Sequence, residues 1–406
     1  MSNPPKSSLQ YNALGASAGK EKLHAVLEEL GALPDKSKNF FCQVSNDVAG
    51  SADHFSVMHC DGAGTKTIIP YLWYKETGSR EFFGRLAADA LVMNLDDVYC
   101  LGKPEQMLLA NAIARNASLI PEEVIKEIIG SYIYLGTKLR SLGVPIEISG
   151  GETADCGDTV RTLVVDATLF SRIKKKYVLD PANISPGDVI VSLASFGRST
   201  YENTDNSGIG SNGLTLARHA LLKKDLLDRY PEIGNPLLDL AHCYQGPFSV
   251  TDEPGDLMMN IGDALSSPTR TYAPVLECIF RELPKDKIRA AIHLTGGAHS
   301  KVLRFCPDNT LIIKDDLFNP PPIFNLIQEH GQVETKEMYK VFNMGTRMEI
   351  YCDESISDNI IQISERFNIA AKKTGYVEKR TTSKHSEKET REVLVKASGQ
   401  ELSYVL

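Results

Sequence analysis

The sequence is short of positive charge. Its 44 Lys and Arg residues are outnumbered by 52 Asp and Glu residues, which gives a formal net charge of −8. A nucleic-acid-binding protein carries a basic surface, so this balance argues against that class and we expect no nucleic-acid partner. The balance does not exclude a small anionic ligand, because a few backbone amides and one lysine can create a local positive site.

The chain also lacks any apolar run long enough to span a membrane. Its first residues, Met1 to Lys6, are polar and contain no signal-peptide core. None of the eight cysteines forms a C-x-x-C pair, which argues against a zinc or redox motif. Their even number permits disulfides, but nothing else indicates secretion, and cysteines in apolar runs such as Val57–Cys60 are typical of buried thiols. We therefore expect a cytoplasmic protein with no membrane partner.

The length of 406 residues predicts two or more domains. The hydrophobic content of 42% is enough for ordinary cores. A Pro-, Gly- and Asp-rich stretch at 181–188 has the composition of a linker between domains. Apolar runs predict strands at 55–60, 107–113, 161–170, 189–193 and 290–294, and helical periodicity predicts helices at 21–30, about 80–101 and 121–142. Residues 224–270 are rich in turn formers and read as irregular.

The first segment that could bind a ligand is the turn Asp61-Gly62-Ala63-Gly64-Thr65-Lys66, directly after the strand at 55–60. Glycines let backbone amides approach an anion closely. Asp61 leaves the end of a strand, where a carboxylate can bind a metal, and Lys66 can reach a phosphate as a point charge. The same residues also fit a plain strand–turn with a surface lysine, so the segment is not decisive alone.

The helix at about 80–101 carries acidic residues on one face. Asp89, Met93 and Asp97 are spaced i, i+4 and i+8, and Asp96 lies next to that face. Two carboxylates on one stripe repel unless a cation sits between them, and magnesium prefers oxygen ligands. Paired aspartates usually lie on a solvated face, but this helix is otherwise largely apolar. We expect its acids to face a cleft.

A glycine turn, Gly150-Gly151-Glu152-Thr153, is predicted after a short strand at 146–149. A glutamate on such a turn can bind a metal directly or through water. Glu152 can equally cap the segment that follows. Both interpretations stay open from the sequence.

Two further turns, Ser211-Asn212-Gly213 and Thr295-Gly296-Gly297, offer backbone amides to an anion. The first opens a predicted helix, where serine or asparagine is usually a cap. The second follows a strand and has the same two interpretations. His293 and His299 flank it, but a lone histidine is more often structural than catalytic, so neither is assigned a role. Together the five segments supply amides, one ammonium and several carboxylates, the groups that hold a magnesium–nucleotide and a second anionic ligand.

At these residues the sequence resembles the phosphoribosylformylglycinamidine cyclo-ligases, also called AIR synthetases, of a superfamily of ATP-binding proteins. The family patterns and their matches are D-G-V-G-T-K at 61–66, D-L-V-A-M-x-V-N-D at 89–97, G-G-E-T-A-E at 150–155, S-N-G-Y-S-L-V-R at 211–218, P-T-R-I-Y at 268–272, H-L-T-G-G-G at 293–298 and E-M-Y-R-T-F-N-C-G at 337–345. The similarity runs from about residue 10 to 380 in the family's order, and the last two patterns are specific to the cyclo-ligase branch. The family's histidine before S-N-G is replaced by Gly210, and 199–210 and 224–267 look expanded.

The resemblance implies an α/β fold of two AIR synthetase-like domains. Residues 1–180 would form an N-terminal ATP-binding and dimerisation domain, whose mixed sheet pairs into a β-barrel across a homodimer. Residues 181–406 would form a C-terminal α/β sandwich.

The resemblance also implies ATP-driven closure of formylglycinamidine ribonucleotide to aminoimidazole ribonucleotide, with Mg2+. The implied residues are Asp61, Asp97 and Glu152 for the metal; Asp61, Gly62, Gly64, Thr65, Lys66, Asp89, Gly151 and Glu152 for ATP and its phosphates; and Ser211, Asn212, Gly213, Thr295, Gly296 and Gly297 for the substrate. No general base is identified. The alternative is a divergent relative, either an enzyme that uses ATP on another amide or phosphate substrate or a non-catalytic nucleotide-binding protein.

Overall fold

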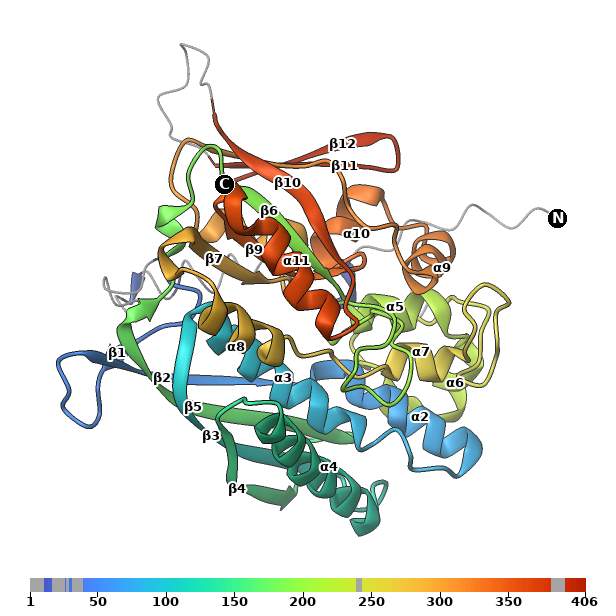
Figure 1. The fold of residues 1–406 in the computed structure, drawn as a ribbon. Helices are drawn as coiled ribbons and strands as arrows, with labels where there is room; N and C mark the ends of the chain where they lie inside the picture. Colours follow the sequence, from blue (N-terminus) through green and yellow to red (C-terminus); the bar gives the residue numbers. More distant parts are fainter. Residues whose placement is uncertain (1–10, 17–25, 27–28, 31–38, 239–242, 381–390) are drawn as a thin grey trace.

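The computed structural model describes residues 11–16, 26, 29–30, 39–238, 243–380 and 391–406. Most of the helix expected at 21–30 lies outside these residues. The described elements form a five-stranded sheet and a seven-stranded sheet, which occupy the lower and upper parts of Figure 1. The first sheet ends at Val178 and the second begins at Val189. The expected two-domain α/β fold class is confirmed, and the described strands do not close a barrel within a single chain.

The lower sheet has the strand order β1-β2-β5-β3-β4. Its elements are β1 (Ser45–Asn46), β2 (His54–Gly62), α2 (Ile68–Thr77), α3 (Arg85–Cys100), β3 (Gly102–Arg115), α4 (Glu122–Ser141), β4 (Ile146–Asp155) and β5 (Leu163–Val178). Only β3 and β4 pair in parallel, and α4 supplies the crossover that a parallel pair requires.

Helix α4 shows why a predicted element forms where it does. Pro121 precedes its first turn, and Glu122 and Glu123 favour the positive end of the helix dipole. Its buried side chains recur at helical spacing and include Val124, Ile128, Tyr132 and Leu139. This apolar stripe packs on the sheet, which confirms the helix expected at 121–142.

Helix α3 lies between the two sheets (Figure 1). It packs on β2 and β5 of the lower sheet and on β7 and α8 of the upper half. Every residue of α3 except Arg85 is buried, including Asp89, Asp96 and Asp97. A carboxylate in such a position requires donors or cations, because an unpaired buried charge is costly.

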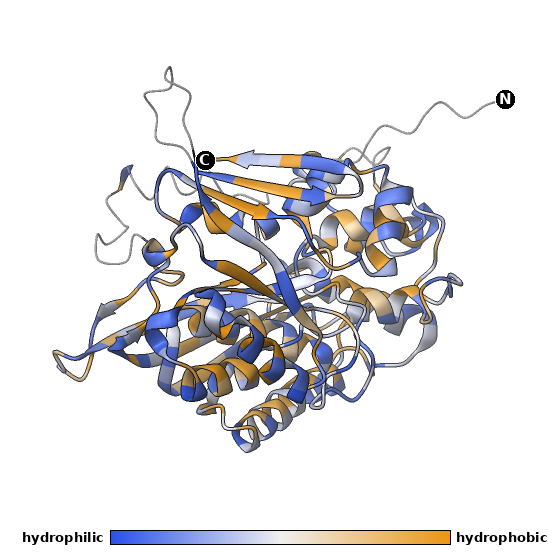
Figure 2. Cartoon of the chain, turned by 45° about the horizontal axis from the view of Figure 1, so that its top comes forward, coloured by the Kyte–Doolittle hydropathy of each residue, from blue (hydrophilic) through white to orange (hydrophobic). Residues whose placement is uncertain are grey.

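The upper sheet has the order β12-β11-β8-β10-β6-β9-β7. Its strands are β6 (Val189–Ala194), β7 (Ile288–His293), β8 (Thr310–Lys314), β9 (Thr346–Cys352), β10 (Ala371–Lys379), β11 (Glu392–Ala397) and β12 (Gln400–Val405). The helices of this half are α5 (Leu214–Leu221), α6 (Lys224–Arg229), α7 (Ile261–Ser266), α8 (Ala273–Glu282), α9 (Pro322–Gly331), α10 (Thr335–Val341) and α11 (Ser357–Arg366). Strands and helices alike mix hydrophobic and hydrophilic residues (Figure 2). Strand β6 is mostly hydrophobic, whereas its neighbour β10 carries four charged residues.

Three expectations need correction. Gly150 and Gly151 do not form a turn but continue β4, because both pair with β3 across a register shift that Gly150 accommodates at φ 150°. Cys60 is exposed rather than buried, since it points to the open face of β2. The segment 224–270 is irregular only in part, because it contains the short helices α6 and α7. No disulfide joins cysteines in the described part of the chain.

One face of the lower sheet is not covered by a helix. Met58, Phe170 and Leu108 are neighbours across β2, β5 and β3 on this face, and Val164 lies further along β5. The exposed fractions of Met58 and Leu108 are 73% and 38%. An apolar row of this kind is typical of a surface that a partner covers. In the part of the chain that is described, no helix combines the length and apolar character that a membrane crossing needs.

Candidate active site at the domain junction

Lys66 forms a buried ion pair at the junction of the two halves. It lies in the short helix η3 (Gly64–Thr67), and its Nζ atom is 2.7 Å from Asp89 Oδ1. The ammonium also donates to the carbonyls of Gly210 and Ser267, at 3.1 and 2.5 Å. Burial lowers the pKa of Lys66, and the charge of Asp89 opposes that effect. The interpretation of Lys66 as a surface lysine is therefore wrong.

Asp89 connects α3 to two predicted motifs of the C-terminal half. Its Oδ1 atom accepts hydrogen bonds from Ser211 Oγ at 3.0 Å and from the amide and hydroxyl of Thr269 at 2.9 and 2.7 Å. Oδ2 has no hydrogen-bond partner. Nearby, Thr65 Oγ1 and Thr215 Oγ1 are 3.0 Å apart. The Asp61–Lys66 turn, α3 and the S-N-G turn thus meet in space, as a shared site requires.

Asp97 occupies the other end of the acidic face of α3. Its Oδ1 atom is 2.7 Å from His293 Nδ1, and its Oδ2 atom is 3.6 Å from His59 Nε2. Burial alone would raise the pKa of Asp97, but the charge of Lys301 and the hydrogen bond from His293 hold it well below the usual aspartate range. Asp97 is therefore an ionised carboxylate at neutral pH.

His293 connects Asp97 to Arg347. Arg347 Nε donates to His293 Nε2 at 3.1 Å, so the ring proton lies on Nδ1 and donates to Asp97. Burial and the nearby Arg347 lower the pKa of His293 to about 4, which keeps the ring neutral. Arg347 Nη2 is 3.3 Å from Met93 Sδ. The cation between the two acids of the stripe is therefore a guanidinium from β9.

Asp96 faces a different set of donors from its neighbour Asp97. It accepts from Thr271 Oγ1 at 2.6 Å and from the Tyr272 amide at 2.9 Å. Burial raises the pKa of Asp96 to about 7, although these two bonds oppose the shift. Asp96 fastens α3 to the start of α8 rather than joining the Asp97 group.

The remaining predicted metal ligands lie on the lower sheet. Asp61 Oδ1 accepts from the Gly62 amide at 2.7 Å. A Cβ atom at Gly62 would overlap Asp166 Oδ1, so the glycine makes room for that carboxylate. Burial, and then the charge of Asp61, raise the pKa of Asp166. Glu152 is exposed, and β3 separates it from Asp166 in the same row of the sheet.

A divalent cation would relieve the repulsion between Asp61 and Asp166, and carboxylate oxygens suit magnesium. Within the described ranges, however, no group of three or more His, Cys, Asp or Glu side chains is arranged to hold a metal ion. Asp61, Asp97 and Glu152 are thus not gathered into one cluster within the chain. Their role as metal ligands stays a prediction.

The T-G-G turn follows β7, close to His293. Lys301 donates to Thr295 Oγ1, and its Nζ atom lies 4.3 Å from the centre of the Phe41 ring. Gly297 adopts φ 91°, and no acceptor is found for its amide among the described residues. In the S-N-G turn, Asn212 Oδ1 is 3.5 Å from Arg347 Nη2, and Gly213 lies against the Phe342 ring. Both turns border the junction, and their contact with a substrate stays a prediction.

Sequence reasoning assigned no role to His293, Lys301 and Arg347 at the junction or to Asp166 on the lower sheet. Asp166 had a usable pattern, because it directly follows the apolar residues Leu163, Val164 and Val165 at the start of β5. A charge in that position is rarely tolerated without a partner or a ligand. Arg347 had no usable pattern, because β9 also carries Glu349.

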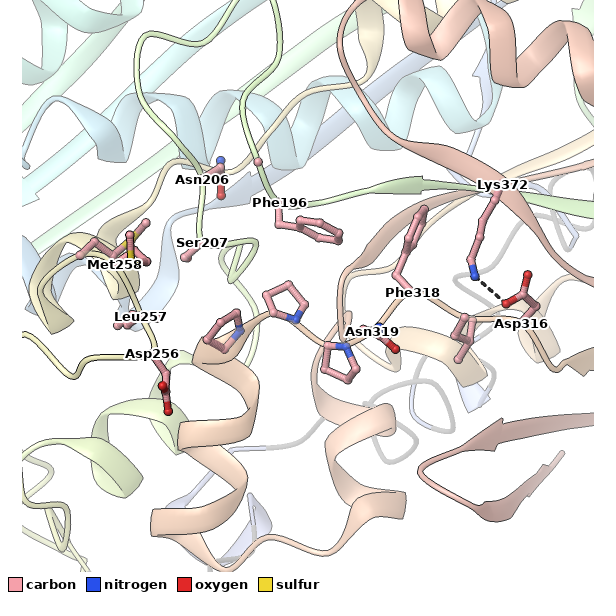
Figure 3. A pocket seen from close by; sticks show the side chains of 16 residues that line it. Phe196, Asn206, Ser207, Asp256, Leu257, Met258, Asp316, Phe318, Asn319 and Lys372 are labelled. Atoms are coloured by element: carbon pink, nitrogen blue, oxygen red, sulfur yellow. Dashed lines mark hydrogen bonds and ion pairs between the residues drawn. The ribbon is translucent and has the colours of Figure 1, made fainter.

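A cavity with a volume of about 790 Å³ lies beside the junction. Phe196, Phe318 and a run of prolines form its walls, and Lys372 pairs with Asp316 at one end (Figure 3). None of the predicted site residues lines it. Ser207 connects it to the junction, because the Ser207 amide donates to Ser267 Oγ and the Ser267 carbonyl accepts from Lys66.

The fold and the junction define a two-domain α/β protein whose halves meet on a buried, charged helix. Two family models match the chain: the N-terminal domain of AIR synthase related proteins over residues 46–173 and the C-terminal domain over 185–387. The chain therefore belongs to the AIR synthase related family.

Curated relatives with the name phosphoribosylformylglycinamidine cyclo-ligase match most of the chain. The protein of Methanocaldococcus jannaschii is 31% identical over 329 residues, which cover 80% of this chain and 79% of that protein. The protein of Thermoanaerobacter pseudethanolicus is 30% identical over 313 residues, with coverages of 75% and 77%. The sequence resemblance to this family is thus confirmed.

Solved structures share the fold. Thermotoga maritima PurL complexed with FGAR has a TM-score of 0.54 and 13% identity, and PurL complexed with ADP has a TM-score of 0.52 and 13% identity. The matches cover 96% of this chain, and the chain spans about half the length of those PurL chains, 51% and 50%. At this identity the likeness concerns the fold alone.

Proposed function

We propose that the chain is a cyclo-ligase of de novo purine biosynthesis that works in the cytoplasm. It would use ATP to close formylglycinamidine ribonucleotide into aminoimidazole ribonucleotide, with release of ADP and phosphate. The main support is a relative of that name with 31% identity over four fifths of the chain. The meeting of the Asp61–Lys66, Asp89–Asp97 and Ser211–Gly213 segments at one junction is consistent with a shared site.

The chemistry explains why such a site needs cations and positioned donors. An amide oxygen is a poor leaving group, so phosphoryl transfer from ATP would first activate it. A neighbouring nitrogen then displaces the phosphorylated oxygen and closes the ring. The protein contributes mainly by positioning the reactants and neutralising the transferred charge.

We assign Mg2+ to Asp61, Asp97 and Glu152, with Asp166 beside Asp61. The charge of Asp61 acts on Asp166, and a cation would relieve the repulsion between these two carboxylates. The ionised state of Asp97 also fits a cation. Because β3 and β5 separate Glu152 from Asp61, nucleotide phosphates or a second chain would have to complete the coordination. When bound, the metal would neutralise the triphosphate.

The glycine turn at 61–66 and Gly151 would lie against ATP, and the S-N-G and T-G-G turns against the substrate. The Lys66–Asp89 ion pair would keep these turns in fixed positions relative to one another. A direct contact of Lys66 with phosphate requires its ammonium to leave three acceptors.

The first prediction concerns the reaction itself. Purified protein with Mg2+, ATP and formylglycinamidine ribonucleotide should release ADP and form aminoimidazole ribonucleotide in equal amounts. The two products are measured by a coupled ADP assay and by the colour reaction of the diazotised aminoimidazole.

Omission of the ribonucleotide is the control and should reduce ADP release to the background rate. ADP release with another amide substrate only would identify a divergent enzyme. ATP binding without any substrate-dependent ADP release would identify a non-catalytic nucleotide-binding protein. Either result would contradict the proposed activity.

The second prediction concerns assembly. We propose that the open face of the lower sheet pairs with a second copy, as the family resemblance implies. A charge at Met58 would then have to be buried in the interface, so Met58→Asp should convert a dimer to a monomer. Light scattering coupled to size-exclusion chromatography measures the mass.

Ile133→Asp is the matched control. Ile133 is an exposed apolar residue of α4, with an exposed fraction of 58%, on the opposite side of the sheet. This variant should keep the mass of the unmodified protein. A monomeric unmodified protein, or a Met58→Asp variant of unchanged mass, would show that the face is not the interface.

A further inference from the structure

Arg347 is a buried cation without a carboxylate in direct contact. Its exposed fraction is 1%, and its Nη1 atom has no hydrogen-bond partner among the residues that the structure describes. The other two nitrogens reach only neutral groups: His293, Met93 Sδ and Asn212 Oδ1. A fully buried guanidinium with an unpaired donor is costly unless a ligand or another group satisfies it.

Other buried cations of the chain are paired differently. Lys66 contacts Asp89, Lys314 contacts Glu349 at 2.6 Å, and Arg270 contacts Glu202 at 2.5 Å. Each has a carboxylate within hydrogen-bond distance. Arg347 therefore differs from these buried cations of the same protein.

The carboxylates around Arg347 have donors of their own. Asp89 accepts from Lys66, Ser211 and Thr269; Asp96 accepts from Thr271 and Tyr272; and Asp97 is bonded to His293 and influenced by Lys301. Their charges act on Arg347 from a distance, but none of them forms an ion pair with it among the described residues. The guanidinium of Arg347 thus has no carboxylate partner of its own among these three acids.

The guanidinium also lies against the turn predicted to bind substrate. A Cβ atom at Gly210 would overlap Arg347 Nη1, and Gly210 has φ 67°. Gly210 immediately precedes Ser211 and Asn212. The unpaired donor therefore points at the backbone that leads into the S-N-G turn, where Gly210 leaves the space for it.

We propose that Arg347 binds phosphoryl oxygens of the substrate at the domain junction, an inference that rests on the proposed function. The planar guanidinium presents parallel N–H donors that match phosphoryl oxygens. Arg347 projects from β9, whereas Met93, which covers it, belongs to α3. Because Arg347 has an exposed fraction of 1%, α3, β9 and the S-N-G turn would have to separate for an anion to reach Nη1.

Arg347→Met tests this role, because methionine keeps an unbranched apolar side chain and removes the charge. We expect kcat/KM for the ribonucleotide to fall by about 10- to 100-fold, the usual range for a hydrogen bond to a charged group. A rise in KM with kcat kept would assign the phosphoryl group to the ribonucleotide phosphate. A fall in kcat with KM kept would assign it to the group transferred from ATP.

Arg218→Met is the matched control. Arg218 is also a buried arginine with an unpaired Nε, but it donates to Tyr244 and the Ile233 carbonyl. It should lower the melting temperature with little effect on KM. Gly210→Ala, which displaces the guanidinium, should reproduce the kinetic defect of Arg347→Met. If Arg347→Met and Gly210→Ala lose no more activity than Arg218→Met, Arg347 only neutralises the acidic face of α3 and the inference is wrong.

A second measurement separates this inference from the proposed function. If the unmodified protein shows no turnover, the proposed function fails, and inorganic phosphate serves as the probe. Phosphate should then raise the melting temperature of the unmodified protein more than that of Arg347→Met. Equal shifts in both proteins would overturn the anion-binding role.

Discussion

Asp89→Ala should lower the free energy of unfolding by about 3–5 kcal/mol, because it leaves the Lys66 ammonium buried without its counter-charge. The loss includes more than one bond, since Asp89 Oδ1 also accepts from Ser211 and Thr269. Both partners of the ion pair have an exposed fraction of 0%, so water cannot replace the carboxylate. Urea unfolding at neutral pH measures the change.

Two further variants sharpen this result. Glu282→Ala removes a surface carboxylate that pairs with Arg366 at 2.8 Å and with Arg281 at 3.0 Å, and should destabilise the protein far less than Asp89→Ala. The double variant Lys66→Met/Asp89→Leu should recover most of the stability lost in Asp89→Ala, because it leaves no unpaired charge. A loss in Asp89→Ala as small as that in Glu282→Ala would show that the junction is accessible to water.

Asp97→Asn should raise the Mg2+ concentration needed for half-maximal turnover by about 10- to 100-fold, the usual effect of changing a group that holds or orients a metal ligand. Asparagine keeps the shape and can still accept from His293, but it removes the charge. The ionised state of Asp97, maintained by Lys301 and His293, is what a cation would use. Steady-state rates over a Mg2+ titration measure the effect.

Asp96→Asn is the matched control on the same helix. Asp96 bonds to Thr271 and Tyr272 instead of His293, so its variant should change stability without changing the Mg2+ dependence. An unchanged Mg2+ dependence in Asp97→Asn would remove Asp97 from the proposed metal site. A large change in both variants would indicate damage to α3 rather than loss of a ligand.

Much of the fold could be predicted because the relevant patterns are local. Helix α4 has its start signal and its apolar stripe in or directly beside its own residues, and β6 is a short, mostly apolar run. Prediction was wrong where distant pairing overrides a local preference. Gly150 and Gly151 favour a turn in isolation, but hydrogen bonds from β3 hold them in a strand.

The candidate site was predictable only in part, for the same reason. Asp89, Lys66 and Ser211 were each named, but the contact between Asp89 and Ser211 joins residues 122 positions apart, and the contact of Lys66 with the Ser267 carbonyl joins residues 201 positions apart. Arg347 and Asp166 were missed because their role depends on space left by Gly210 and Gly62. Nothing in the linear sequence links a glycine in one segment to the charged residue from another segment that fills the space beside it.

The sequence by itself determined the family, the α/β fold class and the acids, lysine and glycine turns available for chemistry. Only the tertiary structure decided the partners of the three acids of α3. Asp89 bonds to Lys66, Asp96 to Thr271 and Asp97 to His293. Helical spacing orients three carboxylates, but it does not select the donors they meet. That selection depends on which remote segments pack against α3, because burial makes every unpaired charge costly and favours the one arrangement that pairs most of them.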